Sequence, residues 1–102
     1  MEHLTFEFDG GGNAPKPGKT YAVAGVVSSS NLEVLAEPKE LGGKVRFEVD
    51  TTVANFEEAW RAVFADFMER RGPKDVLFSI NDFAAIPPVV SLRLEQAWEG
   101  LE

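Results

Sequence analysis

The feature that most constrains the fold is one apolar stripe at helical spacing in the second half of the chain. Hydrophobic side chains recur there three or four positions apart, as on one face of an α-helix. Such a stripe is more often packed than used as a ligand site, so the rest of the chain must supply a surface that covers it. We therefore expect one helix against a sheet. The stripe consists of Phe56, Ala59, Trp60, Val63, Phe64, Phe67 and Met68.

Both ends of this helix carry sequence signals. Asn55, followed three residues later by Glu58, resembles a capping box, in which each side chain satisfies an exposed backbone donor. Arg70 and Arg71 suit the negative end of the helix dipole. The Gly-Pro pair at 72–73 cannot continue a helix. The sequence therefore predicts a helix that begins near Asn55 and ends at Arg71.

The remaining apolar residues follow the period of two that is typical of half-buried strands. Residues 31–38 place Leu32, Val34 and Ala36 on one face, until Pro38 ends the run. Residues 44–49 likewise turn Val45, Phe47 and Val49 inward, and 76–80 is a short, mostly apolar run. The predicted strands cover residues 4–8, 20–27, 31–38, 44–49 and 76–80.

The predicted elements are separated by loops rich in glycine and proline. Residues 9–19 are expected to form one such loop, and residues 81–88 another. Pro87 or Pro88 is suited to the start of a second helix, where the missing amide hydrogen costs nothing. The prediction is a single α+β domain over residues 1–102, with a mostly antiparallel sheet of about five strands covered by two helices.

Composition limits the classes of binding partner and the cellular compartment that we expect for this protein. The formal net charge of -7 repels phosphate backbones and anionic bilayers, which argues against nucleic acid and membrane partners. No apolar run reaches the length of a transmembrane helix, and residues 1–4 lack the pattern of a signal peptide, so we expect a cytoplasmic protein. The chain has no cysteine. Any thiol chemistry would therefore need an attached group.

Candidate catalytic motifs are weak. A serine hydrolase needs a base within hydrogen-bond reach of its nucleophile, but the one histidine, His3, is expected to be solvated in a frayed terminus. No Gly-x-Ser-x-Gly elbow occurs, and a metal site would have to rest on carboxylates without EF-hand spacing. We expect no catalytic residue and no metal site.

Three consecutive serines, Ser28, Ser29 and Ser30, precede Asn31 between two predicted strands. Serine and asparagine readily form side-chain turns, so a simple hairpin turn accounts for the run. The alternative is a hydroxyl displayed at a loop apex for modification by another enzyme, which would bring its own catalytic groups. Composition alone leaves both interpretations open.

The order of several blocks resembles the acyl carrier (delta) subunit of bacterial malonate decarboxylase. The blocks are MEHLTFEF, AGVVSSSNLEVL with EP after it, TTVANFEEAWRAVF and INDFAAIPPVVSLRLEQAWE. The resemblance implies a non-catalytic carrier whose serine, matching Ser29, is joined through a phosphodiester to phosphoribosyl-dephospho-CoA. The thiol of that group carries acetyl and malonyl residues. The family usually flanks its serine with glycines, and Ser28 and Ser30 at those places are alternative attachment sites.

The resemblance also implies partners: an acyl transferase subunit, decarboxylase subunits and the prosthetic-group transferase. We further expect residues 81–88 to lie near the serine turn. There, Asp82 could order the surface and amides at the start of the last helix could favour the phosphates of the arm. Alternatively, Asp82 only caps a turn.

Two other functions fit parts of the sequence. The gamma subunit of citrate lyase is also a small serine-modified carrier. An interaction domain with an unmodified serine turn is an alternative of another class.

Overall fold

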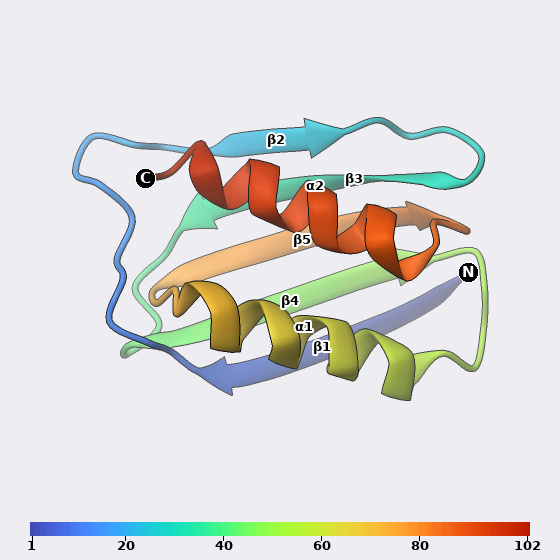
Figure 1. Ribbon diagram of the computed structural model, residues 1–102, viewed down its shortest axis with the longest axis horizontal. Coiled ribbons are helices and arrows are strands. Elements are labelled where there is room, and N and C mark those ends of the chain that lie inside the picture. Colours follow the sequence, from blue (N-terminus) through green and yellow to red (C-terminus); the bar gives the residue numbers. More distant parts are fainter.

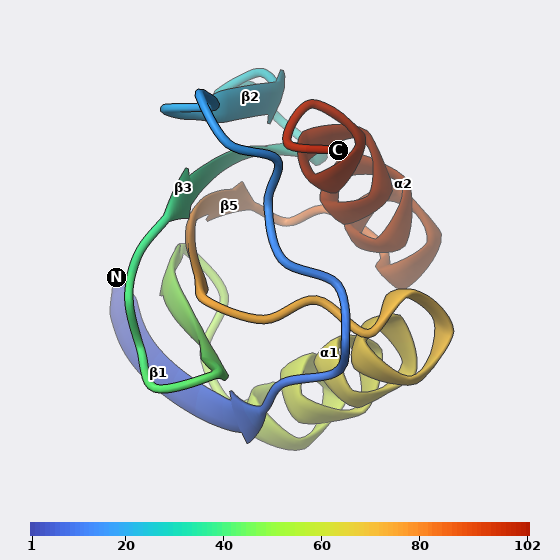
Figure 2. The same ribbon diagram turned by 90° about the vertical axis from the view of Figure 1, so that its left-hand side faces the viewer.

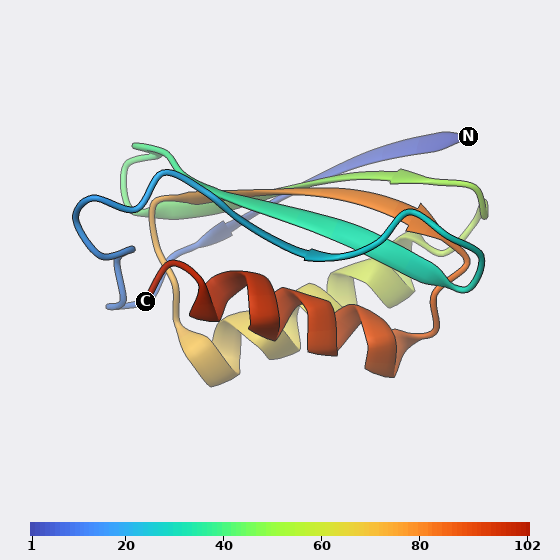
Figure 3. The ribbon, with the colours of Figure 1, turned by 90° about the horizontal axis from the view of Figure 1, so that it is seen from above.

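The computed structural model describes residues 1–102 as one five-stranded sheet with two helices (Figure 1). Figures 2 and 3 show both helices on the same face of the sheet, which confirms the predicted α+β fold. Neither helix is long and apolar enough to cross a membrane. The elements are β1 (Glu2–Asp9), β2 (Ala22–Gly25), β3 (Asn31–Pro38), β4 (Lys44–Thr51), α1 (Glu57–Arg71), β5 (Val76–Phe83) and α2 (Pro87–Glu99).

The strand order is β1-β4-β5-β3-β2, with antiparallel pairing except between β4 and β5. Parallel neighbours require a crossover connection, and α1 supplies it. The sheet is therefore mostly antiparallel, as predicted. Its central parallel pair was not predicted, because alternation within one strand says nothing about which strand lies beside it.

The core lies between the sheet and the helices. The two strand faces predicted to point inward, Leu32/Val34/Ala36 and Val45/Phe47/Val49, are fully buried. On β4, Phe47 stacks on Phe64 of α1 at 4.1 Å and on Phe78 of β5 at 5.1 Å, measured between ring centroids. This stack joins the centre of the sheet to the middle of α1.

The predicted start of α1 is wrong in detail. The helix begins at Glu57, its N-cap is Phe56, and no side chain caps it. Asn55 has a φ of 69°, a left-handed conformation that asparagine tolerates, so it belongs to the preceding turn. Trp60, Phe64 and Phe67 are buried as the stripe predicts, but Ala59 is exposed and Phe56 is 51% exposed. The part of the stripe that lies at the first turn of the helix is therefore exposed to solvent.

Only β3 has the predicted bounds. β1 and β4 are somewhat longer than the predicted 4–8 and 44–49, and the larger differences concern β2 and β5. β2 is limited to Ala22–Gly25, because the backbone leaves the strand at Gly25 with a φ of 84°. β5 continues through residues 81–83, for which the sequence predicts a loop. Pairing explains the extension, because Asp82 lies opposite Leu32 of β3 and Thr51 of β4. The second helix begins at Pro87, as predicted.

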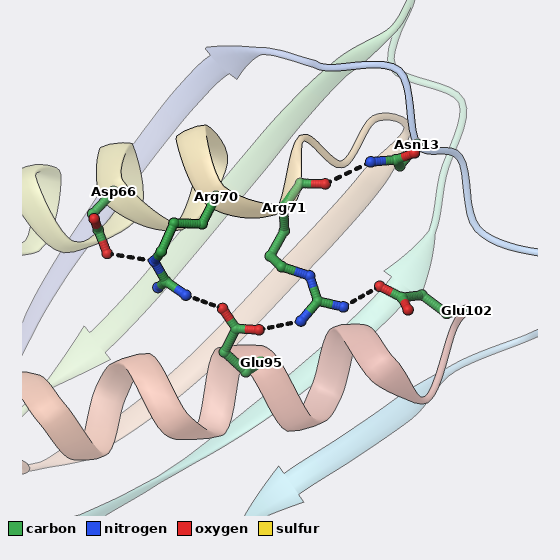
Figure 4. A network of polar contacts seen from close by, with 6 residues as sticks. All are labelled: Asn13, Asp66, Arg70, Arg71, Glu95 and Glu102. Atoms are coloured by element: carbon green, nitrogen blue, oxygen red, sulfur yellow. Dashed lines mark hydrogen bonds and ion pairs between the residues drawn. The ribbon is translucent and has the colours of Figure 1, made fainter.

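The two helices are tied together by ion pairs near the end of α1 (Figure 4). Glu95 of α2 accepts hydrogen bonds from both Arg70 and Arg71, and Arg71 also pairs with Glu102. Arg70 donates to Asp66 at 2.9 Å, and this hydrogen bond raises the pKa of Arg70. The two arginines, predicted to complement the helix dipole, therefore also fix α1 relative to α2.

Asp75 joins the connection between α1 and β5 to the turn between β3 and β4. Its Oδ1 accepts the backbone amides of Leu41 at 3.0 Å and Gly43 at 2.8 Å. These hydrogen bonds, of which that from Leu41 is the stronger influence, lower the pKa of Asp75 below its ordinary value. Asp75 has a φ of 55°, a left-handed conformation that aspartate and asparagine both tolerate, so an asparagine could replace it without added backbone strain.

We expect the stability difference between the wild type and Asp75→Asn to depend on pH. A carboxyl whose pKa is lower in the folded state stabilises that state above its unfolded pKa, and this contribution is lost as pH falls through the folded pKa. The wild type should therefore be the more stable form near neutral pH, and the difference should shrink below about pH 4. Urea unfolding of both proteins over a pH series measures it. A difference that stays constant would contradict the role given to the charge.

Candidate functional site at the serine turn

The serine run forms the turn between β2 and β3, as the sequence predicted. Ser28, Ser29 and Ser30 are all exposed within residues 26–30, where the hairpin turns at one end of the sheet (Figure 1). The preceding Val26 and Val27 are also exposed, at 56% and 54%. The turn thus presents three small hydroxyl side chains next to an apolar flank.

Backbone hydrogen bonds distinguish the three serines. The carbonyl of Ser28 accepts the amide of Asn31 at 3.1 Å, which closes a four-residue turn. The amide of Ser30 donates to the carbonyl of Phe83 at 2.8 Å, and its φ of 60° fits the third position of a type II turn. Ser28 and Ser30 therefore anchor the turn. Ser29, between them, takes part in neither of these backbone hydrogen bonds.

Gly25 sets the direction in which the turn leaves β2. A Cβ at this position would lie 2.0 Å from the carbonyl oxygen of Leu32, and the φ of 84° is itself unfavourable for other residues. Only glycine avoids both the overlap and the strain. The base of the turn is therefore fixed by a close contact between β2 and β3.

We expect Gly25→Ala to lower the free energy of unfolding by at least about 2 kcal/mol, because overlap and backbone strain act together. Gly12→Ala is the matched control, since no atom lies within 4 Å of the added Cβ and its φ is not positive. That change should stay within about 0.5 kcal/mol of the wild type. Urea unfolding of the three proteins tests this, and equal effects at both glycines would contradict it.

The histidine is not placed to activate a serine. It is solvated as predicted, with its side chain 57% exposed, but its terminus is not frayed. His3 lies in β1 rather than in a frayed terminus, and its Nδ1 is 2.7 Å from Oδ1 of Asp50. β1 is separated from β3 by β4 and β5. Three strand spacings amount to roughly 14 Å, which is far beyond hydrogen-bond reach of the serine turn.

Neither a metal site nor a catalytic base accompanies the exposed hydroxyls. The histidine and carboxylates form no group of three or more that could hold a metal ion. Two candidates for a base bond elsewhere, His3 to Asp50 and Asp82 to the hydroxyl of Thr51. The turn can therefore present a hydroxyl but has no built-in means of activating it.

The structure places Asp82 next to the turn, as expected, and gives it a structural role. Asp82 is 3% exposed, and its carboxylate accepts hydrogen bonds from the Thr51 hydroxyl at 2.8 Å and the amides of Ala84 and Ala85. It thus orders the connection between β5 and α2. Neither Asp82 nor Thr51 presents a free polar group to the serine turn.

The expected phosphate site at the start of α2 is wrong. Pro87 and Pro88 have no amide hydrogen, and the amides of Val89 and Val90 both donate to the carbonyl of Ile86. The first turn of the helix therefore has no free amide with which to bind an anion. The prolines that indicate where the helix starts are the reason that it cannot serve as an anion site.

An α+β domain with an exposed serine turn and no local base fits the carrier class, in which a displayed side chain is acted on by other proteins. The comparison with known sequences identifies the family. Residues 19–101 match the malonate decarboxylase delta subunit family, MdcD. The chain belongs to this family, and it is a carrier rather than a catalytic subunit.

Relatives match over nearly the whole chain. The malonate decarboxylase acyl carrier protein of Xanthomonas campestris pv. campestris strain B100 is 49% identical over 100% of this chain and 96% of its own length. That of Stenotrophomonas maltophilia R551-3 is 46% identical over 99% of this chain and 94% of its own length. A chain in the crystal structure of a Pseudomonas malonate decarboxylase hetero-tetramer in complex with malonate superposes with a TM-score of 0.87, at 40% identity, with 100% of both chains covered.

Proposed function

We propose that this chain is the acyl carrier subunit of a malonate decarboxylase and that Ser29 is its attachment point. The group attached is phosphoribosyl-dephospho-CoA, joined through a phosphodiester to the serine hydroxyl. When bound, it supplies the thiol that carries acetyl and malonyl groups as thioesters. The observation that carries the proposal is an exposed serine at the tip of a hairpin in a chain that belongs to this family.

The surroundings of Ser29 fit a covalently attached group. The neighbouring side chains are the small Ser28 and Ser30, so a modifying enzyme could reach the hydroxyl. The chain has no cysteine, and an attached thiol would supply what its own side chains lack. The lack of a local base is compatible with modification, because the prosthetic-group transferase would provide the catalytic groups.

We choose Ser29 over its neighbours because of the backbone hydrogen bonds within the turn. Ser28 and Ser30 each use a backbone group to hold the hairpin, through Asn31 and Phe83 respectively. A group on Ser29 would extend from the middle of the turn and leave both of these hydrogen bonds in place. The left-handed φ of Ser30 also explains how the usual flanking glycine fits this position, since glycine adopts that conformation without strain.

In malonate decarboxylation, the proposed role of the chain is to present the acyl group to its partner subunits and to keep it tethered near them. The proposed partners are an acyl transferase subunit, decarboxylase subunits and the prosthetic-group transferase, in the cytoplasm. A related chain belongs to a malonate decarboxylase hetero-tetramer, which supports assembly with other subunits. A tether holds its cargo at an effective concentration on the order of millimolar near the active sites of the transferase and decarboxylase subunits. Val26 and Val27, exposed beside the serines, provide an apolar surface for such partners.

Intact mass after co-expression with the prosthetic-group transferase tests the proposal. We expect an increment equal to phosphoribosyl-dephospho-CoA, and peptide mapping should place it within residues 26–30. An unmodified mass, with a transferase shown to be active on a known relative, would favour an interaction domain instead. Acyl preference of the partner subunits separates a malonate carrier from a citrate lyase carrier.

A further inference from the structure

An apolar cavity of about 330 Å³ opens between the first turns of α1 and α2. Nine of the twelve residues that line it are hydrophobic, so its walls favour an apolar group. Trp60 and Val90 form buried parts of the wall. Phe56 and Ile86 are also part of the lining but are 51% and 60% exposed, which places them where the cavity meets solvent.

The cavity lies at the same end of the molecule as the serine turn. The amide of Ser30 bonds to the carbonyl of Phe83, and the next three residues, Ala84, Ala85 and Ile86, all line the cavity. Figure 1 shows the β2–β3 turn, the end of β5 and the starts of both helices together at this end. A flexible arm anchored at Ser29 would therefore begin beside the cavity.

The only charged group in the lining of the cavity is negative. The carboxylate of Asp82, 3% exposed, and the hydroxyl of Thr51, fully buried, are hydrogen-bonded to each other at 2.8 Å. No lysine, arginine or histidine lines the cavity. A second carboxylate placed there would be desolvated without a cation and would face a like charge.

We propose that this cavity holds the acetyl-thioester end of the prosthetic arm and excludes the malonyl-thioester end. The inference rests on the proposed function, because it requires an arm at Ser29. The methyl group and the adjoining methylenes of an acetyl thioester match the apolar walls, and each buried methylene favours the bound state by roughly fourfold. Because the arm is tethered at an effective concentration on the order of millimolar, an intrinsic dissociation constant on the order of 0.1 mM is enough to fill about nine-tenths of the cavities.

The free carboxylate of a malonyl thioester changes this balance. It would have to leave water for apolar walls that contain Asp82 and no compensating cation. The acetyl form should therefore rest against the carrier, while the malonyl form stays extended toward a partner. The cavity would thus distinguish the two acyl states by charge.

The two tryptophans allow a direct test by NMR on the loaded chain. Trp60 lines the cavity, whereas Trp98 of α2 does not and is 1% exposed in the core. Intact mass first confirms that the arm and the acyl group are present. We then expect the indole N–H resonance of Trp60 to shift between the thiol and acetyl forms, with that of Trp98 unchanged. The malonyl form should leave Trp60 at its thiol-form position.

A variant pair tests the cavity through thioester reactivity. Ala59 is exposed at the cavity, so Ala59→Leu should obstruct it, while Ala65→Leu makes the same change at an exposed α1 position outside the lining. With nine-tenths of the acetyl ends bound, cleavage by hydroxylamine should be roughly tenfold slower than for acetyl-CoA. Ala59→Leu should remove this protection and Ala65→Leu should keep it.

The outcomes separate the two proposals. If the mass shows an acetylated arm but Trp60 does not shift and the thioester is not protected, the cavity has another occupant, such as a side chain of a partner, and the inference is wrong while the carrier function stands. An equal Trp60 shift with malonyl would overturn the selection by charge. A chain that acquires no arm would overturn both.

Discussion

Ser29→Ala is expected to abolish covalent loading completely, because it removes the hydroxyl oxygen that we propose forms the phosphodiester. The turn itself should survive, since its hydrogen bonds run through the backbone of Ser28, Ser30 and Asn31. Intact mass after co-expression with the prosthetic-group transferase should show only the unmodified chain. Malonate decarboxylation by the assembled complex should be lost with the arm.

Two neighbouring variants serve as controls for this prediction. Ser28→Ala removes a hydroxyl but leaves the carbonyl that accepts the amide of Asn31. Ser30→Gly removes a hydroxyl and suits the φ of 60°. Both should still be loaded to the wild-type extent. Loading that persists in Ser29→Ala and disappears in one of the controls would move the attachment point to that serine.

Phe47→Ala is expected to have the largest effect on stability, about 3–5 kcal/mol. Phe47 is fully buried, and its ring contacts Phe64 and Phe78 as well as Phe8 and Phe67. Its removal leaves a cavity where the sheet meets α1. Because a domain of this kind is stable by only about 5–15 kcal/mol, the loss is a large fraction of the total.

Phe56→Ala is the matched control for that substitution. Phe56 has the same side chain but is 51% exposed and makes no aromatic contact with the core stack. Its replacement should lower the free energy of unfolding by only about 1 kcal/mol, because half of its surface is already in water. Urea unfolding followed by circular dichroism compares the two. Similar losses for both variants would contradict the packing role assigned to Phe47.

The sequence predicted the elements and their buried faces better than their arrangement. Alternation identifies which side of β3 and β4 is buried, because an inward set such as Leu32/Val34/Ala36 must share one face. It carries no information about strand order, so the parallel β4–β5 pair could not be predicted. The extension of β5 through Phe83 depends on pairing with β3 and β4, which no local pattern of residues 81–83 records.

The features of the candidate site likewise fall into those that the sequence predicts and those that only the fold shows. The turn and its exposed serines follow from local composition, and the family resemblance indicates Ser29. The burial of Asp82 was not predicted, because its partners Thr51, Ala84 and Ala85 come together only in the folded sheet. The apolar stripe of α1 was expected to be packed throughout. Its exposed beginning at Phe56 and Ala59 is what reveals the cavity.

The position of the chain ends has a practical consequence. Glu2 pairs with Thr51, which pairs with Asp82, which pairs with Leu32, so the amino terminus lies at the serine end of the sheet. Figure 1 shows the carboxyl terminus toward the opposite end. An affinity tag or surface linker fused after Glu102 would keep the hairpin facing the solution, whereas one fused before Met1 would compete for space with any enzyme that must reach it.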